Sequence, residues 1–116
     1  MTITRLHSNP RLSGAVTFGD LVFLSGLVPG DVVDAGGQTR EVLARIDALL
    51  AEAGSDKDHL LGATIYLKNI AEDFAAMNEV WSAWLSPGQA PTRTTVQAEL
   101  ARPQVLVEIT VIAARS

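Results

Sequence analysis

Residues 90–113 have the sequence A-P-T-R-T-T-V-Q-A-E-L-A-R-P-Q-V-L-V-E-I-T-V-I-A. Within Thr92–Leu100 the side chains alternate between two faces, a period that predicts a β-strand. Within Val105–Ala113 both faces are apolar except at Glu108 and Thr110, a pattern typical of a strand covered on both sides in a sheet interior. Residues Ala101–Gln104 would form a short turn between the two. We therefore predict two adjoining strands around which the rest of the chain is organised.

Glu108 stands in the middle of an apolar strand, where an unpaired charge is costly, so it needs a partner or a function. Arg93 is the candidate partner. If Thr95 lies opposite Glu108, Arg93 is a diagonal neighbour on the same face, with Cβ atoms roughly 7–8 Å apart. A slip of one residue would place the two side chains on opposite faces. Their contact is therefore a hypothesis, and a plain cross-strand ion pair is the structural alternative to a functional site.

The size and composition of the chain indicate a single domain over residues 1–116. Hydrophobic residues make up 47% of the sequence, which is typical of a globular protein. The 9 basic and 13 acidic residues give a net charge of −4, and no basic run occurs. We therefore do not expect nucleic-acid binding through a basic surface.

The chain has no cysteine, which excludes disulfides and thiol chemistry and is compatible with a reducing cytosol. Residues 1–8 lack the apolar core of a signal peptide, and no stretch is long and apolar enough for a membrane span. We therefore expect a cytoplasmic protein. The two histidines, His7 and His59, are far apart in sequence and make a poor metal set, so neither a metal nor an organic cofactor is expected.

Other strands and two helices follow from periodicity and turn signals. Gly19-Asp20 is a hairpin signal, Gly54 fits the position that ends a helix, and the glycines between residues 26 and 37 predict a loop. The predicted strands are Ile3–Ser8 at a sheet edge, Ala15–Phe18, Leu21–Ser25 and His59–Lys68. The predicted helices are Gln38–Ala53 and a second one, capped by Asn69 and running to about Leu85.

The predicted order is β-β-β-α-β-α-β-β, which indicates an α+β fold with both helices on one face of the sheet. The helices leave the other face open, yet the last strand is apolar on both faces. That open face therefore needs a cover. Another subunit is the simplest cover, so we predict an oligomer.

Four segments match one known family in order and spacing: G-D-L-V-F-L-S-G-L-V-P, D-F-A-A-M-N-E-V-W, A-P-T-R-T-T-V-Q-A-E-L and V-E-I-T-V-I-A-A. The chain resembles the Rid (RidA/YjgF-like) family of reactive intermediate deaminases, which act on imines and enamines, and within it a short, arginine-bearing subgroup. The likeness spans nearly the whole chain. It implies a chorismate-mutase-like α+β fold with a mixed β-sheet. It also implies a homotrimer with ligand clefts between neighbouring subunits.

The resemblance implies roles for six residues. Arg93 would hold the substrate carboxylate, and Glu108 would orient or activate water. The other implied substrate contacts are Ser25, Gly26, Asn78 and Thr95, the last standing where the family has a cysteine that often contributes through its backbone.

Two functions follow as alternatives. The resemblance implies a cofactor-independent hydrolase that converts 2-imino acids, such as 2-iminobutanoate or 2-iminopropanoate, or enamines, to 2-keto acids and ammonia. A guanidinium suits the carboxylate, and a carboxylate suits proton transfer from water. The alternative is a non-catalytic module that binds a small carboxylate or keto acid in the same cleft. Leu12 and Leu27 favour this alternative because they replace a tyrosine and a glutamine of the family.

Overall fold

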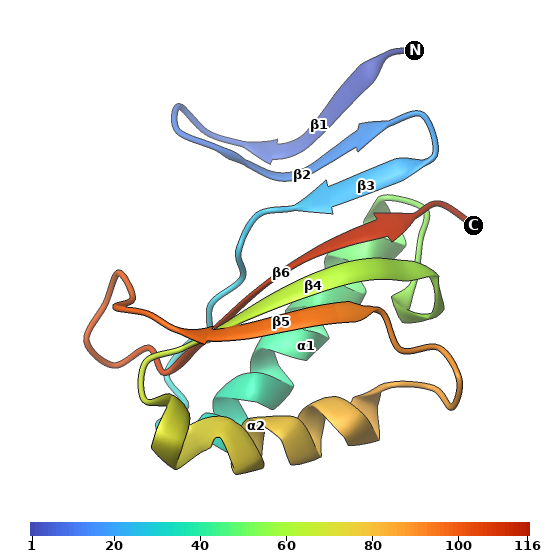
Figure 1. Ribbon diagram of the computed structural model, residues 1–116. Coiled ribbons are helices and arrows are strands. Elements are labelled where there is room, and N and C mark those ends of the chain that lie inside the picture. Colours follow the sequence, from blue (N-terminus) through green and yellow to red (C-terminus); the bar gives the residue numbers. More distant parts are fainter.

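The computed structural model describes residues 1–116 as a six-stranded sheet with two helices on one of its faces (Figure 1). The strand order is β1-β2-β3-β6-β4-β5. The strands are β1 (Ile3–Ser8), β2 (Ser13–Phe18), β3 (Leu21–Leu24), β4 (Leu60–Leu67), β5 (Thr92–Gln97) and β6 (Val107–Ala114). The helices are α1 (Ala35–Glu52) and α2 (Ile70–Trp84), and a 3-10 turn, η1 (Lys57–His59), leads into β4.

The N-terminal half of the sheet agrees with the sequence patterns. β1 is an edge strand, and β2 and β3 form a tight hairpin in which Phe18 pairs with Leu21. Gly19 in the turn has a φ of +59°, a left-handed conformation that glycine adopts without strain. The predicted element order and the placement of both helices on one sheet face are also confirmed (Figure 1).

The predicted pairing of the last two strands is wrong. β5 pairs with β4 in parallel, and β6 pairs antiparallel with both β3 and β4, so β4 separates β5 from β6. The reason is α2, which carries the chain from the end of β4 back to its start, as a parallel strand pair requires. The expected turn at Ala101–Gln104 is part of a longer connection, residues 98–106, that brings β6 into the middle of the sheet.

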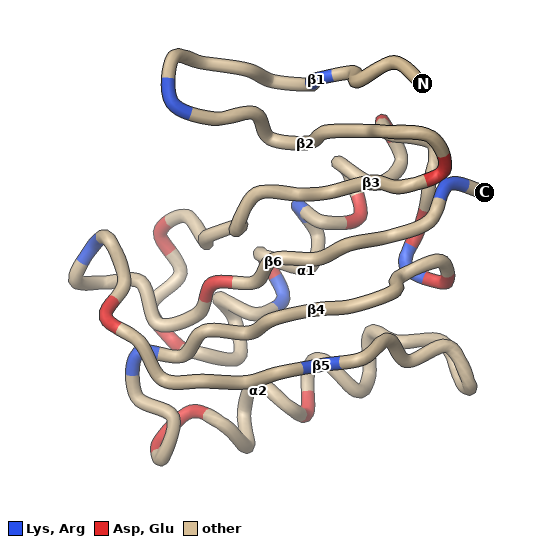
Figure 2. Tube along the Cα trace, turned by 45° about the horizontal axis from the view of Figure 1, so that its top comes forward, with Lys and Arg blue, Asp and Glu red and all other residues tan.

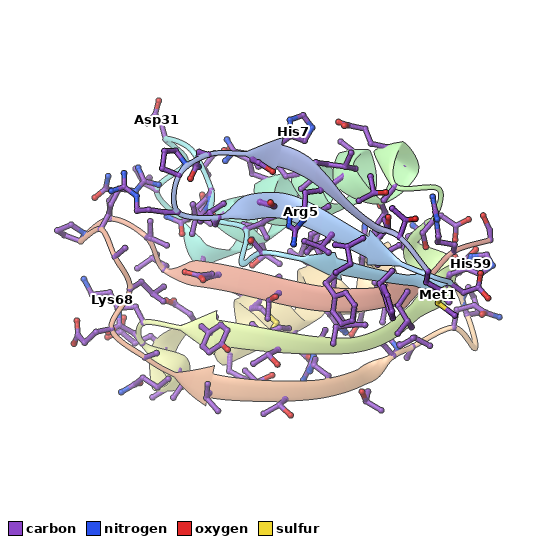
Figure 3. All side chains as sticks on the ribbon, turned by 90° about the horizontal axis from the view of Figure 1, so that it is seen from above. Met1, Arg5, His7, Asp31, His59 and Lys68 are labelled. Carbon is purple, nitrogen blue, oxygen red and sulfur yellow. The ribbon has the colours of Figure 1, made fainter.

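Alternate residues of the central strands divide the sheet into a covered and an open face. The odd-numbered positions of β6 and, from Ala63 on, of β4 are buried under the helices, and they pack with apolar residues of α1. This core includes Ala63, Ile65, Leu67, Val107, Ile109, Val111, Val42, Ile46 and Leu50. Figure 3 looks onto the opposite, open face, behind which the helices lie. There Phe23 and Ile112, paired across β3 and β6, remain 38% and 41% exposed.

The start of α1 differs from the prediction, whereas α2 lies between Asn69 and Leu85 as predicted. α1 begins earlier than Gln38, because the Asp34 carboxylate accepts a hydrogen bond from the Gly37 N–H at 2.8 Å and caps the helix. The predicted loop therefore ends before Ala35. Asn69 precedes α2 but makes no capping hydrogen bond; instead, Gln97 Oε1 of β5 accepts from the Ile70 N–H at 2.9 Å.

A buried glutamine fixes the connection between β5 and β6. Gln38 Nε2 donates to the carbonyls of Val32 and Gln104, both at 2.9 Å, and its Oε1 accepts from the Leu106 N–H at 2.7 Å. Because Gln38 is fully buried, these bonds form away from competing water. α1 thereby positions the residues that lead into β6.

Neither helix combines the length and the apolarity that crossing a bilayer requires.

Candidate functional site

The six residues singled out in the sequence lie in two groups on opposite faces of the sheet. Arg93 is in register with Ala63 of β4, whose side chain faces the helices, whereas Glu108 is in register with Tyr66 on the open face. The predicted contact between Arg93 and Glu108 within one chain is therefore wrong. It assumed that β5 and β6 are neighbours, but β4 lies between them.

The first group lies at the β5 edge, against α2. Arg93 is half-buried, and its Nη1 donates to Asn78 Oδ1 at 2.7 Å. The guanidinium lies 5.7 Å from the ring centre of Phe74 and 5.9 Å from that of Trp81, distances at which a cation interacts with an aromatic face. Asn78 is the single acceptor that the chain offers this guanidinium. The remaining N–H groups of Arg93 are therefore free to bind an anion.

Thr95 lies two residues farther along β5 and also faces the helices. Its hydroxyl oxygen is buried and has no hydrogen-bond partner. A buried hydroxyl without a partner is costly. No residue of the chain accounts for the burial of the Thr95 hydroxyl without a partner.

Gly26 and Glu108 of the second group line a cleft of about 400 Å³ on the open face, and Ser25 precedes them in the chain outside its lining. Glu108 stands in this cleft, beside Gly26 and opposite Tyr66. The other lining residues are Ala98, Glu99, Leu100, Ala101 and Thr110. The cleft thus contains two carboxylates and no cationic side chain.

Gly26 is required by the close approach of Glu108. A Cβ atom at this position would overlap with Glu108 Oε2 and lie 3.1 Å from its Cδ. Only glycine leaves room for the carboxylate next to the backbone here. Leu27, the next residue, is bonded to Ile109 through both backbone groups, at 2.8 and 3.1 Å.

Ser25 has a structural role in the chain. Its hydroxyl donates to the Ser13 carbonyl at 2.6 Å, and its N–H donates to the Gly14 carbonyl at 3.0 Å. These bonds hold the start of the loop against β2. Ser25 therefore supports Gly26 beside Glu108.

Two polar residues of the cleft, Tyr66 and Glu99, were missed in the sequence. Tyr66 was assigned to the predicted strand His59–Lys68, but only its pairing with Glu108 places it in the cleft. Glu99 was assigned to a strand, whereas it lies in the connection after β5. No local pattern marks either residue, because both reach the cleft through strand pairing.

Other hollows of the molecule contain none of the six residues. One of about 410 Å³ lies between α1 and α2, and one of about 340 Å³ lies on the open face among Thr64, Thr92, Thr94 and Thr110. Nowhere do three or more His, Cys, Asp or Glu side chains come together in a group that could hold a metal ion. Basic residues are scattered along the trace and form no continuous stripe (Figure 2).

Comparison with known proteins identifies the family. Residues 2–115 match the family described as Endoribonuclease L-PSP. A RutC family protein of Escherichia coli K12, YoaB, is 44% identical over 114 residues, which cover 98% of this chain and 99% of that protein. The chain belongs to the YjgF/Rid family. The expected family is thereby confirmed.

Solved structures of the YjgF/Rid family share the fold. A YjgF family protein of Neisseria meningitidis superposes with a TM-score of 0.97 at 48% identity, covering 100% of this chain and 97% of that one. A Rid family protein of Yersinia pestis gives a TM-score of 0.83 at 33% identity, covering 92% and 90%. The predicted α+β, chorismate-mutase-like fold is therefore confirmed.

Proposed function

We propose that this Rid family protein hydrolyses 2-imino acids or enamines to 2-keto acids and ammonia. Arg93 binds the substrate carboxylate, and Glu108 orients the attacking water and accepts a proton from it. The observation that carries the proposal is the Glu108 carboxylate itself. It stands in an open cleft, forms no ion pair within the chain, and has a glycine beside it that leaves it room.

Because the sheet separates Arg93 from Glu108, one small substrate cannot touch both groups in a single chain. We therefore propose that the site forms between copies of the chain in a homotrimer. The β5 edge of one copy, with Arg93, Asn78 and Thr95, would adjoin the Glu108 cleft of the next. Charge supports this pairing, since the cleft holds two carboxylates and lacks a cation of its own.

In such a site the hydrolysis follows from the residues present. The free N–H groups of Arg93 bond the substrate carboxylate in a fixed plane. Glu108 accepts a proton from water as the water oxygen bonds to the imine carbon. Glu108 then passes that proton to the nitrogen. The hydroxyl of the adduct then gives up its remaining proton, which Glu108 carries to the nitrogen as the C–N bond breaks. Ammonia leaves with both protons of the water, and the oxygen becomes the keto oxygen.

As a direct test, the imine is generated in situ with an amino-acid oxidase, and the release of keto acid and ammonia is measured. We expect Arg93→Ala to lower kcat/KM by about 100-fold, because a charged hydrogen-bonded contact contributes roughly 1.5–3 kcal/mol. Arg93→Lys should recover little of the rate, since an ammonium does not reproduce the planar fork.

Arg40→Ala, at an exposed position of α1, is the matched control and should keep the full rate. A wild-type rate equal to that of the uncatalysed reaction would refute the proposed enzyme. Full activity in Arg93→Ala would refute its role.

A second candidate, the non-catalytic binding of a small carboxylate or keto acid, is favoured by the few free polar groups near Glu108. Ser25 uses its hydroxyl on Ser13, and Leu27, paired with the buried Ile109, packs against the core and does not line the cleft. Thermal stabilisation by pyruvate without any turnover of imines would support this candidate over the enzyme.

A further inference from the structure

Tyr66 is the polar neighbour of Glu108 on the open face. The two residues are directly paired between the antiparallel strands β4 and β6. Directly opposite residues in such a pair have Cβ atoms about 4.5–5.5 Å apart, so their side chains stand next to each other. Both line the same cleft of about 400 Å³, and both are half-buried.

The Tyr66 phenol has no structural partner. The hydroxyl of Thr110, its neighbour in the cleft, bonds the Leu24 carbonyl at 2.8 Å, but no hydrogen bond within the chain uses the Tyr66 hydroxyl. Glu108 forms no ion pair either. Two adjacent polar groups in one cleft are thus left to interact with what enters it.

We propose that Tyr66 is a further catalytic residue of the deaminase, and that its phenol and Glu108 hold the attacking water between them. This inference rests on the proposed function. A carboxylate can only accept hydrogen bonds, whereas a phenol hydroxyl both donates and accepts. A water between Glu108 and Tyr66 gives one hydrogen to each oxygen, and this directs a lone pair toward the imine carbon.

The proton count is that of the hydrolysis described above. Glu108 takes the first proton of the water when the C–O bond forms. Tyr66 Oη continues to accept a hydrogen bond from the second, which now belongs to the hydroxyl of the adduct. Glu108 returns the first proton to the nitrogen and then carries the second proton from the adduct hydroxyl to the nitrogen as the C–N bond breaks. Both protons of the water thus leave with ammonia, and no proton leaves the phenol. Tyr66 therefore fixes the geometry of attack without changing the stoichiometry.

Tyr66→Phe tests this role, because it removes the hydroxyl and keeps the ring. We expect kcat to fall about tenfold with KM changed less than twofold, since a tenfold loss corresponds to about 1.4 kcal/mol, within the range of one hydrogen bond made in the transition state. Thr64→Val is the matched control: it removes a hydroxyl from the same strand and the same face, in the neighbouring hollow. It should keep the wild-type rate.

Tyr66 is also the single tyrosine of the chain, so 3-fluorotyrosine labels this position alone. The ¹⁹F resonance of the labelled protein should shift when pyruvate is added. In Arg93→Ala the same shift should require much higher pyruvate concentrations. A merely structural tyrosine would respond to neither change.

The outcomes separate the two proposals. A wild type that accelerates hydrolysis while Tyr66→Phe keeps its full kcat would refute the role of Tyr66 and leave the deaminase intact. A ¹⁹F resonance that pyruvate at inhibitory concentrations does not move would also refute it. A wild type with no activity at all would refute the proposed function, and the role of Tyr66 with it.

Discussion

At the scale of single residues, the contact between Gly26 and Glu108 decides how the carboxylate is presented. Only the terminal oxygen of a flexible side chain would overlap with an added Cβ, although Cδ and Cγ would be tight at 3.1 and 3.3 Å. The backbone at Gly26 does not have a positive φ, so alanine is not excluded by its conformation. A substitution there should therefore move Glu108 rather than unfold the protein.

We expect Gly26→Ala to lower kcat/KM at least tenfold while it costs less than about 1 kcal/mol of unfolding free energy. Imine hydrolysis and thermal melting measure the two effects. Gly62→Ala is a suitable control, because its Cβ would meet Thr92 Oγ1 at 3.0 Å on the same face but outside the cleft. Full activity in Gly26→Ala would contradict the proposed role of Glu108 as the group that orients and deprotonates water.

The sequence was sufficient to select Arg93 and Glu108 as candidate site residues, but it could not place them. Their relation depends on which strands are neighbours, and one intervening strand puts them on opposite faces. Tyr66 and Glu99 show the same limit. Their types and periodicity are ordinary, and only the sheet order brings them to Glu108.

At the scale of the elements, the first turn of α2 contains a carboxylate, Asp73, that is partly removed from water. Asp73 Oδ2 is buried without a hydrogen-bond partner. Burial raises the pKa of Asp73 above its ordinary value of 3.8, and the neighbouring charge of Glu72 raises it further. The folded state therefore binds this proton more tightly than the unfolded state does. Stability contributed by Asp73 is present at low pH and is lost as the pH rises through the folded pKa.

Asp73→Asn should thus be more stable than the wild type at pH 7, and this difference should shrink as the pH falls below about 4. Melting temperatures at both pH values measure it. Glu79→Gln, which removes an exposed carboxylate from the same helix, should show no such dependence. A pH-independent difference for Asp73→Asn would show that burial of its charge is not the cause.

The elements themselves were largely predictable because each depends on local chemistry. The Gly19 turn and the apolar period of α1 identify their structures directly. The pairing of β5 was not predictable in this way, since consecutive strands are often neighbours and the sequence of residues 98–106 resembles a hairpin turn. The Asp34 cap was missed for a related reason, because the glycine pair after it favours a loop.

At the scale of the whole molecule, the open face carries exposed apolar side chains that an oligomer would cover. Phe23 and Ile112 are paired there, beside the hollow lined by threonines. Contiguous apolar surface of this kind is characteristic of an interface between protein chains. The proposed trimer therefore links solubility to activity, since the same association would bring Arg93 to Glu108.

We expect Phe23→Asp to dissociate the oligomer, because a charge buried without a partner is costly, and to abolish imine hydrolysis. Sedimentation velocity and the hydrolysis assay give the two readouts. Val33→Asp, at a position 82% exposed before α1, should preserve both assembly and rate. A wild type that sediments as a monomer and is fully active would refute the shared site.

The central place of β6 has a consequence for synthesis. The ribosome completes residues 107–114 after every other strand, yet this strand joins β3 to β4. A nascent chain that lacks it holds two half-sheets with unsatisfied edges, β1-β2-β3 and β4-β5. The growing polypeptide therefore stays vulnerable to misassociation until residues 107–114 have emerged, because this strand closes the sheet between β3 and β4.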